Sequence, residues 1–330
     1  MKLLKLVPAE TNVPFLKAKG IAAVISSILL VASIALFFTL SLNYGIDFKG
    51  GVAIEIGMVE EDGGVDRKVP VAAVREALAS FGDVSVQGFN NDNEAMIRIE
   101  RQEGGDEAQT NAIAEARRLL TDAVPGIEFR QENTVGAKVS GELKQDGALS
   151  VAIAVIAVLI YIWFRFEWQF GLGAVIALVH DVALTIGFFS ITGLEFNLSI
   201  IAAILTIVGY SLNDTVVVYD RIRENIRRYR KKTIPEIIDL SLNQTLSRTL
   251  MTSITTLVAL ISLYVFGVEA IRGFTAAMIW GVVIGTYSSV FVAAPILTQF
   301  AIQREAFYPA GDKEKAEGSA KSGNPFESMP

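Results

Sequence analysis

The sequence of 330 residues contains no cysteine and a single histidine, His180. It therefore has no disulfide framework and no thiolate nucleophile, and a zinc site would lack its usual ligands. Charged residues are also scarce, at 19% of the chain, whereas an ordinary soluble domain carries about 25%. We find no phosphate-binding loop, metal-ligand cluster or nucleophile–base constellation, so the sequence predicts neither an enzyme nor a cofactor.

What the sequence has instead is long apolar runs. Hydrophobic residues make up 52% of the chain, and a run of about 20 apolar residues has the length of a membrane-spanning helix. We predict six transmembrane helices, over residues 21–42, 147–165, 170–192, 198–219, 248–267 and 273–300. Pro295 is expected to kink or end the last of them.

The first apolar run follows Lys17 and Lys19, an arrangement that is also found in cleavable signal peptides. The apolar region of such a peptide is about 7–15 residues long and ends at small residues that a peptidase recognises. Residues 21–42 are longer than this and lack such a cleavage site, so a permanent membrane anchor is favoured.

Basic residues predict the orientation, because lysine and arginine gather on the cytoplasmic side of membrane helices. They are concentrated in residues 1–20 and 220–247, which we predict to be a cytoplasmic terminus and a basic cytoplasmic loop. Both chain termini are therefore expected in the cytoplasm, and residues 43–146 are expected outside it. The polar tail, residues 301–330, has a composition typical of disordered segments.

The predicted external segment, residues 43–146, carries 20 acidic and 11 basic residues. Its pattern predicts strand, helix, strand, strand, helix and strand, over residues 52–56, 71–81, 84–89, 96–99, 106–123 and 127–131. This βαββαβ order is typical of a ferredoxin-like α+β domain, with an antiparallel sheet and two helices on one face. No basic stripe for nucleic acid is present, so a structural or polypeptide-contacting role is expected.

Ionisable residues inside the apolar runs are few. Such a group costs about 2.5–3.5 kcal/mol at the centre of a bilayer, so it usually faces protein or water and serves a function. If its helix leaves the membrane near Arg221, Asp214 lies about 10 Å inside that end. A carboxylate solvated from the cytoplasmic side is the alternative, but aspartate is short and reaches the interface poorly, which favours a functional role.

Arg248 begins the next helix at about the depth of Asp214, so an ion pair between them is possible. Thr245, Arg248, Thr252 and Thr255 follow one another at helical spacing, and such a polar stripe is expected to face the bundle. An arginine that extends to the interface explains Arg248 alone equally well. The pairing suggests a switch in which protonation of Asp214 releases Arg248 and lets the helices shift.

His180 and Asp181 lie near the middle of the third apolar run. Adjacent residues point about 100° apart on a helix, so the two side chains are not expected to share a partner. Asp181 can accept a hydrogen bond from a neighbouring helix or take part in a proton relay, and the sequence favours neither role; His180 is a slightly weaker candidate for the same proton pathway.

Taken together, these features resemble the SecF family, the smaller membrane subunit of the bacterial SecD–SecF complex for protein export. The resemblance spans about residues 42–298. It is carried by Asn43-Tyr44-Gly45-Ile46-Asp47-Phe48-Lys49-Gly50-Gly51, by His180-Asp181-Val182, by the run from 209 to 225, and by Ser247-Arg248-Thr249-Leu250-Met251-Thr252-Ser253.

The resemblance implies half of an RND-type transporter, with six helices and one external periplasmic domain, in the bacterial inner membrane. SecD would supply the other half, and the pair would use the proton motive force to help an unfolded preprotein leave the SecYEG channel, with YajC as a further partner. Asp214 matches the family's proton-pathway carboxylate, Arg248 its arginine partner and Thr252 the nearby threonine. The structural signature at the base of the external domain is matched by Gly45, Asp47, Gly50 and Gly51.

Three other functions stay open at this point. Half of an RND-type small-molecule transporter would usually come with a second such half and a larger external domain. A scaffold that stabilises the export channel would tolerate loss of charge at Asp214 and Arg248. A membrane enzyme would need reactive groups that the sequence does not offer.

Overall fold

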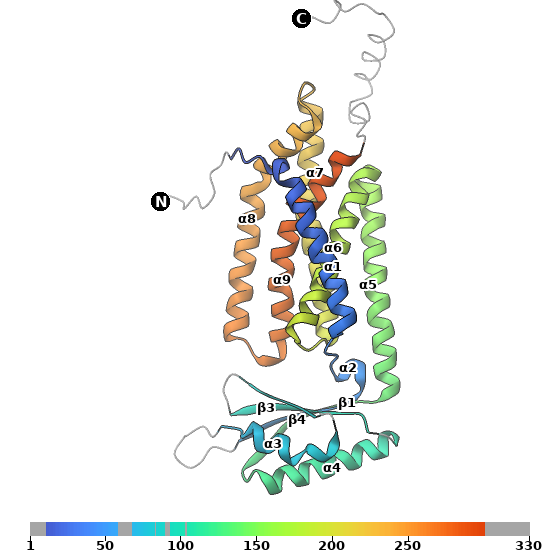
Figure 1. The fold of residues 1–330 in the computed structure, drawn as a ribbon, viewed down its shortest axis with the longest axis vertical. Coiled ribbons are helices and arrows are strands. Elements are labelled where there is room, and N and C mark those ends of the chain that lie inside the picture. Colours follow the sequence, from blue (N-terminus) through green and yellow to red (C-terminus); the bar gives the residue numbers. More distant parts are fainter. Residues whose placement is uncertain (1–10, 59–67, 83, 90–92, 103, 301–330) are drawn as a thin grey trace, which may run out of the picture.

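A bundle of long helices with a four-stranded sheet at one end makes up the computed structural model of the chain (Figure 1). The structure describes residues 11–58, 68–82, 84–89, 93–102 and 104–300. The predictions for residues 1–10 and for the tail 301–330 lie outside the described residues. The described chain begins and ends at the end of the bundle opposite the sheet.

Within the described residues, six helices are long and apolar enough to cross a membrane, as the sequence predicts. Their bounds are α1 (Lys19–Leu40), α5 (Ala137–Arg165), α6 (Trp168–Thr192), α7 (Leu198–Arg228), α8 (Ile234–Phe266) and α9 (Arg272–Ser288). Short 3-10 turns precede α1 and α9, as η1 (Phe15–Ala18) and η3 (Glu269–Ile271).

The last membrane segment is interrupted ahead of Pro295. Regular α9 ends at Ser288 and continues as a π-helical turn, η4 (Ser289–Ala293), followed by α10 (Ala294–Ile296) and η5 (Leu297–Gln299). A proline has no main-chain N–H and crowds the preceding turn, and a π-helical turn relieves both problems. The predicted disturbance near Pro295 is thus present as a change of helix type.

Three helices, α5, α7 and α8, extend well beyond the predicted bounds. The predicted starts at 147 and 248 and the predicted end at 219 are replaced by Ala137, Ile234 and Arg228. The prediction followed charge-free runs, whereas a helix continues into water wherever one of its faces can pack against a neighbour.

The segment 220–247, predicted as a basic loop, is therefore a helical hairpin formed by the ends of α7 and α8. Thr233 and Glu236 form a capping box at the start of α8, in which each side chain accepts a hydrogen bond from the main-chain N–H of the other. Across the hairpin, the amide of buried Asn225 donates to Ser241 Oγ at 2.9 Å. These contacts hold both helices well beyond their charge-free runs.

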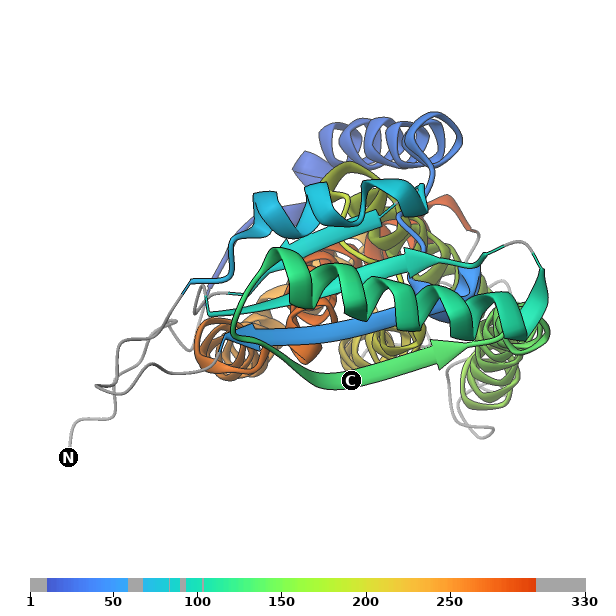
Figure 2. The same cartoon turned by 90° about the horizontal axis from the view of Figure 1, so that it is seen from below.

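The sheet has the predicted ferredoxin-like topology. Its elements are β1 (Gly51–Met58), α3 (Val71–Ala77), η2 (Ala79–Phe81), β2 (Val84–Gly88), β3 (Glu94–Glu100), α4 (Gly105–Ala123) and β4 (Ile127–Val135). The strand order is β2-β3-β1-β4, and every neighbouring pair is antiparallel. Figure 2 shows α3 and α4 across one face of the strands with the bundle behind, and the core between them includes fully buried Ile54, Leu78, Ile97 and Leu120.

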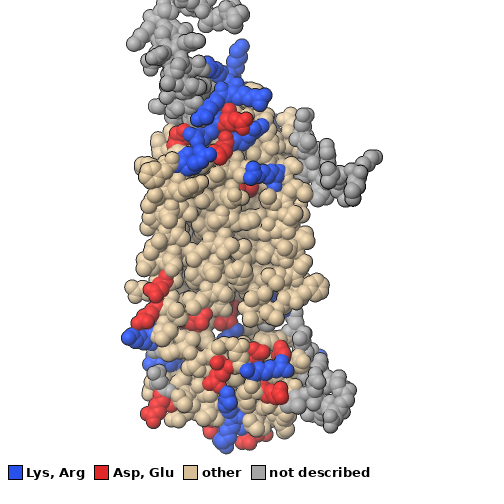
Figure 3. Space-filling model, turned by 180° about the vertical axis from the view of Figure 1, so that it is seen from behind, with Lys and Arg blue, Asp and Glu red and all other residues tan. Residues whose placement is uncertain are grey.

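Charged side chains gather at the two ends of the molecule and leave a broad uncharged band over the bundle (Figure 3). Within the helices, large apolar side chains point outward, among them Phe164 and Phe266, each 86% exposed. Water would oppose such exposure, whereas lipid tails favour it. The chain is a membrane protein.

Candidate functional site in the helix bundle

Two carboxylates are buried inside the bundle. Asp181 on α6 is 1% exposed and Asp214 on α7 is 7% exposed. A buried carboxylate is costly unless it is hydrogen-bonded or carries a proton. Their partners therefore determine what the site can do.

Asp214 is held by hydroxyl groups from two other helical segments. Thr249 Oγ1 on α8 donates to Asp214 Oδ1 at 2.7 Å, and Ser289 Oγ on η4 donates to Oδ2 at 3.1 Å. The carboxylate thus ties together α7, α8 and the π-helical turn. Because a hydroxyl can donate to a carboxylate or accept from a carboxylic acid, these partners suit both protonation states.

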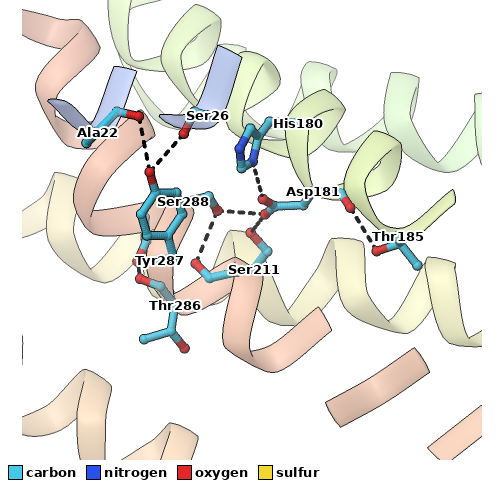
Figure 4. A network of polar contacts seen from close by, with 11 residues as sticks. Ala22, Ser26, His180, Asp181, Thr185, Ser211, Thr286, Tyr287 and Ser288 are labelled. Atoms are coloured by element: carbon cyan, nitrogen blue, oxygen red, sulfur yellow. Dashed lines mark hydrogen bonds and ion pairs between the residues drawn. The ribbon is translucent and has the colours of Figure 1, made fainter. Parts of the chain in front are cut away.

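Asp181 accepts hydrogen bonds from both neighbouring helices (Figure 4). Ser211 Oγ on α7 and Ser288 Oγ at the end of α9 donate to Asp181 Oδ2 at 2.6 and 2.7 Å. The hydrogen bonding that the sequence allowed for Asp181 is therefore present, with two donors.

His180 and Asp181 have no common hydrogen-bond partner among the described residues, as expected. Their side chains nevertheless contact each other directly, with His180 Nδ1 2.9 Å from Asp181 Oδ1, a contact that the sequence did not predict. The 100° step separates the two Cβ directions, but an imidazole is long enough to turn back around the helix toward its neighbour's carboxylate. The pair is buried together between α6 and α9.

The two carboxylates share one piece of chain. Ser288, which donates to Asp181, and Ser289, which donates to Asp214, are consecutive residues at the junction of α9 and the π-helical turn. Single π-helical turns inside α-helices are frequent at functional sites. Sequence reasoning missed both serines, although a run of polar residues, Thr286-Tyr287-Ser288-Ser289, interrupts the last apolar segment.

The expectation that the whole polar stripe on α8 faces the bundle is wrong. Its member Thr245 is buried together with Thr249 and Ser253, whereas its members Arg248 and Thr252 are exposed. The buried face follows steps of four residues, which the alternating steps of the predicted stripe miss. Thr252 Oγ1 donates to main-chain oxygens of its own helix, that of Arg248 at 3.1 Å among them.

The predicted ion pair between Asp214 and Arg248 is not formed among the described residues. Thr249, the neighbour of Arg248, contacts Asp214 instead. The guanidinium is nevertheless near enough to attract the Asp214 carboxylate electrostatically. Arg248 therefore lies beside the site, on the outer surface of this chain.

Exposed polar and small residues continue on the neighbouring helix. We name the polar outer face after its members on α7 and α8, which are Thr206, Gly209, Asn213, Arg248, Thr252 and Thr255. At Gly209 no atom of the described residues lies within 4 Å of a Cβ built there, so this position is open on the outer face. Small and polar residues are typical of helix–helix contacts in membranes rather than of lipid contacts.

The glycine-rich signature lies where the sheet meets the bundle. Gly50 and Gly51 have φ values of 75° and 125°, and a Cβ on Gly51 would collide with the main-chain oxygen of Ile99. Asp47, on the short helix α2 (Ile46–Lys49), accepts a hydrogen bond from Leu198 N at 2.9 Å and so caps the start of α7. The turn into β1 and the first turn of a membrane helix are thus fixed together.

A salt bridge reinforces this junction. Arg98 on β3 pairs with Glu195 in the turn between α6 and α7. Burial raises the pKa of Glu195 above its usual range, and Arg98 opposes this shift while Asp47 adds to it. Gly45 lies directly beneath, where a Cβ would collide with the Glu195 carboxylate.

The described residues contain no group of three or more His, Asp or Glu side chains that could hold a metal ion. The groups available at the site are carboxylates, hydroxyls and one imidazole. Such groups bind, orient and transfer protons.

Two family profiles match the chain. Residues 115–303 match the profile described as protein export membrane protein SecD/SecF, C-terminal, and residues 35–58 match the SecD/SecF GG motif. Together they cover the glycine-rich signature and the buried carboxylates with their hydroxyl partners, whereas Arg98 of the junction lies outside both.

Curated proteins give the same result. The protein translocase subunit SecF of Cereibacter sphaeroides is 44% identical over 309 residues, which cover 91% of this chain and 93% of that protein. SecF of Rickettsia akari is 44% identical over 304 residues and covers 90% of this chain and 95% of that protein. The protein translocase subunit SecDF of Brucella abortus is 43% identical over 318 residues, and the match covers 95% of this chain but 40% of that longer protein.

Solved structures agree. The crystal structure of SecDF from Thermus thermophilus, described as a translocon-associated membrane protein, matches with a TM-score of 0.77 and 32% sequence identity. The match covers 89% of this chain and 39% of that chain, so this chain corresponds to about two fifths of it. SecDF in its super-membrane-facing form matches with a TM-score of 0.65.

Proposed function

Because the chain belongs to the SecF family of protein-export membrane proteins, we propose that it uses the proton motive force, together with SecD, to complete preprotein translocation. The observation that carries this proposal is the environment of Asp214. It is a buried carboxylate in a membrane helix, held by two hydroxyl groups from two other segments. Intramembrane carboxylates of this kind are typical of proton relays.

The hydroxyl partners support reversible protonation of Asp214. Ser289 Oγ lies 3.1 Å from Asp214 Oδ2 and also 3.0 Å from the main-chain oxygen of Thr286. When Asp214 is charged, the serine donates a hydrogen bond to it. When Asp214 is neutral, the serine donates to the main-chain oxygen of Thr286 and accepts a hydrogen bond from the carboxyl O–H instead. Both states then keep their hydrogen bonds, so neither is penalised by a buried polar group without a partner.

Arg248 would convert this protonation into movement. A charged Asp214 attracts the guanidinium, and a neutral Asp214 releases it, so α8 would shift relative to α7. One charge that crosses 100 mV supplies about 2.3 kcal/mol. This energy changes the ratio of two conformations by about 50-fold, which is enough to drive a two-state element.

SecD is the partner that fits the polar outer face. The exposed charge of Arg248 would be costly against lipid, and the small and polar residues around it suit contact with another helix. A second six-helix half packed there would cover them and bring its own groups to Asp214. The relatives named SecDF support this pairing, because each carries the matching segment within one longer chain.

We assign the chain to the bacterial inner membrane with its termini in the cytoplasm and the sheet in the periplasm. Lysine and arginine at the bundle end opposite the sheet support this orientation. A preprotein that leaves SecYEG would then emerge on the side of the sheet domain. YajC remains a partner expected from the family resemblance.

The test is export of a secretory preprotein into inverted membrane vesicles after ATP is exhausted. Asp214→Asn is compared with wild type at matched levels of SecD, with and without a proton gradient. Asp220→Asn is the matched control, because Asp220 lies on the same helix in an exposed ion pair with Arg165. We expect the gradient to complete translocation in wild type and the control alone. Equal completion in all three would refute the motor and favour the scaffold.

A further inference from the structure

A cleft of about 540 Å³ lies between α1, α6 and the segment from η4 to η5. Lys19 and Gln299 line it at the bundle end opposite the sheet, and Ser27 and His180 line it about 10 Å deeper along α1. His180 is 4% exposed, and its Nε2 has no hydrogen-bond partner among the described residues. The walls of the cleft are mostly apolar, but Lys19, Ser26, Ser27, His180 and Gln299 place polar groups on them, and the cleft is large enough for several water molecules beside those groups.

The two nitrogens of His180 therefore differ, because Nδ1 is paired with a carboxylate whereas the buried Nε2 has no partner among the described residues. Nδ1 contacts Asp181, and the carboxylate selects the tautomer with its proton on Nδ1, which leaves a lone pair on Nε2. The ring of Tyr287 stacks on the imidazole at 6.2 Å, and its hydroxyl contacts Ser26 on α1 at 2.9 Å (Figure 4). The imidazole is thus held in place between the cleft and the bundle interior.

We propose that His180 transfers protons between water in this cleft and the Asp181 carboxylate, which makes the pair a second proton-binding site beside Asp214. A proton from water binds Nε2, and the Nδ1 proton passes to Asp181 Oδ1. The imidazole is then neutral again, with its proton on Nε2, and the carboxylate has become a neutral acid. The reverse transfer returns one proton to the cleft, so the charge of the pair alternates between −1 and 0.

Few other charges act on His180. Its own helix contributes Asp181, α9 contributes Tyr287, and α1 contributes Lys19 at the far end of the cleft. The cleft-lining residues of η4, α10 and η5 that the structure describes are uncharged. Protonation of the pair is therefore governed by Asp181 and by access of water.

The second site communicates with the first through the consecutive serines. Ser288 Oγ lies 2.7 Å from Asp181 Oδ2 and 3.2 Å from the main-chain oxygen of Gly285, so its hydroxyl can turn away once Asp181 is neutral. Ser289, the next residue, donates to Asp214. Proton uptake at Asp181 thus alters the turn that holds the donor to Asp214. This link rests on the proposed function, whereas the protonation of His180 does not.

The experiment uses the fact that His180 is the only histidine of the chain. The full chain, labelled with ¹⁵N-histidine and purified through a tag without histidine, is placed in lipid nanodiscs and followed by NMR as the pH is lowered. We expect a neutral imidazole with its proton on Nδ1 at high pH, a change to the tautomer with its proton on Nε2 when Asp181 takes up a proton on acidification, and exchange of the Nε2 proton with water. Asp181→Asn should abolish the preference for the Nδ1 tautomer.

Ala23→Leu tests the cleft, because Ala23 lines it. We expect this variant to slow exchange with water at least tenfold, and Ser27→Leu to do the same if Ala23→Leu does not fold. Ala32→Leu is the matched control, an exposed alanine of α1 outside the cleft lining, and should exchange like wild type.

Equal exchange in all leucine variants, absence of the tautomer change, or magnetisation transfer to His180 from lipid acyl chains instead of water would overturn the proposal. These results do not depend on export. If Asp214→Asn exports normally while His180 changes tautomer and exchanges its proton through the cleft, the motor fails and the second site stands. If export needs Asp214 but His180 does not exchange with water, only the second site fails.

Discussion

Thr249→Val removes one hydroxyl from the environment of Asp214 and changes little else. Thr249 is 2% exposed, and its Oγ1 donates to Asp214 Oδ1 at 2.7 Å. Valine has nearly the same shape, so packing is retained while the donor is lost. The charged carboxylate loses a partner that the neutral acid needs less.

The magnitude follows from the kind of hydrogen bond. A bond to a charged group contributes about 1.5–3 kcal/mol, and 1.36 kcal/mol corresponds to one pH unit. The variant should therefore move the pH dependence of gradient-driven export upward by about one to two units, because the charged form is the one destabilised. The maximal rate at the best pH should change much less.

The assay is the rate of gradient-driven translocation in inverted vesicles, measured across a series of pH values at constant gradient. Thr245→Val is the matched control, since Thr245 is buried on the same helix and donates to main-chain oxygens of that helix. A profile that shifts equally in both variants, or in neither, would show that the Thr249 hydroxyl does not stabilise the charged form of Asp214.

Three further predictions concern the sheet and the helix ends. Gly51→Ala should destabilise the sheet domain by about 1–3 kcal/mol because of its positive φ and the collision with Ile99. Denaturant unfolding should detect this loss, and Gly88→Ala, where the added Cβ meets only ordinary contacts, should destabilise the domain much less. Burial raises the pKa of Glu195, so its stabilising contribution is complete below the usual glutamate pKa of 4.5 and is lost as the pH rises through the raised value; Glu195→Gln should remove this slope from stability measured against pH. Thr233→Ala should cost about 1 kcal/mol by loss of the cap, seen as faster hydrogen exchange at the start of α8, and unchanged exchange would contradict it.

The fold could be predicted where its signals are local. Apolar runs located the six membrane helices of the described residues, and the patterns within residues 43–146 predicted the order of strands and helices along the chain. The helix ends at Ala137, Arg228 and Ile234 could not be predicted in this way, because they depend on packing between segments rather than on the polarity of one segment.

The site could be predicted only in its charged members. Asp181 and Asp214 stand out because a carboxylate in an apolar run is costly. Their hydroxyl partners do not, because serine and threonine are common in membrane helices, where they bond to carbonyls of their own helix. Which side chain of one helix contacts the next depends on how the helix is rotated about its axis. The rotation of α8 brings Thr249, and not Arg248, into contact with Asp214.

If Asp214 carries the protons that drive export, proton movement across the membrane must depend on its carboxylate. This movement is measured in vesicles that contain the chain with SecD and an unfolded polypeptide, with a pH-sensitive dye under an imposed potential. We predict a proton flux in wild type that Asp214→Asn abolishes and Asp220→Asn retains. An undiminished flux with Asp214→Asn would show that Asp214 does not carry these protons.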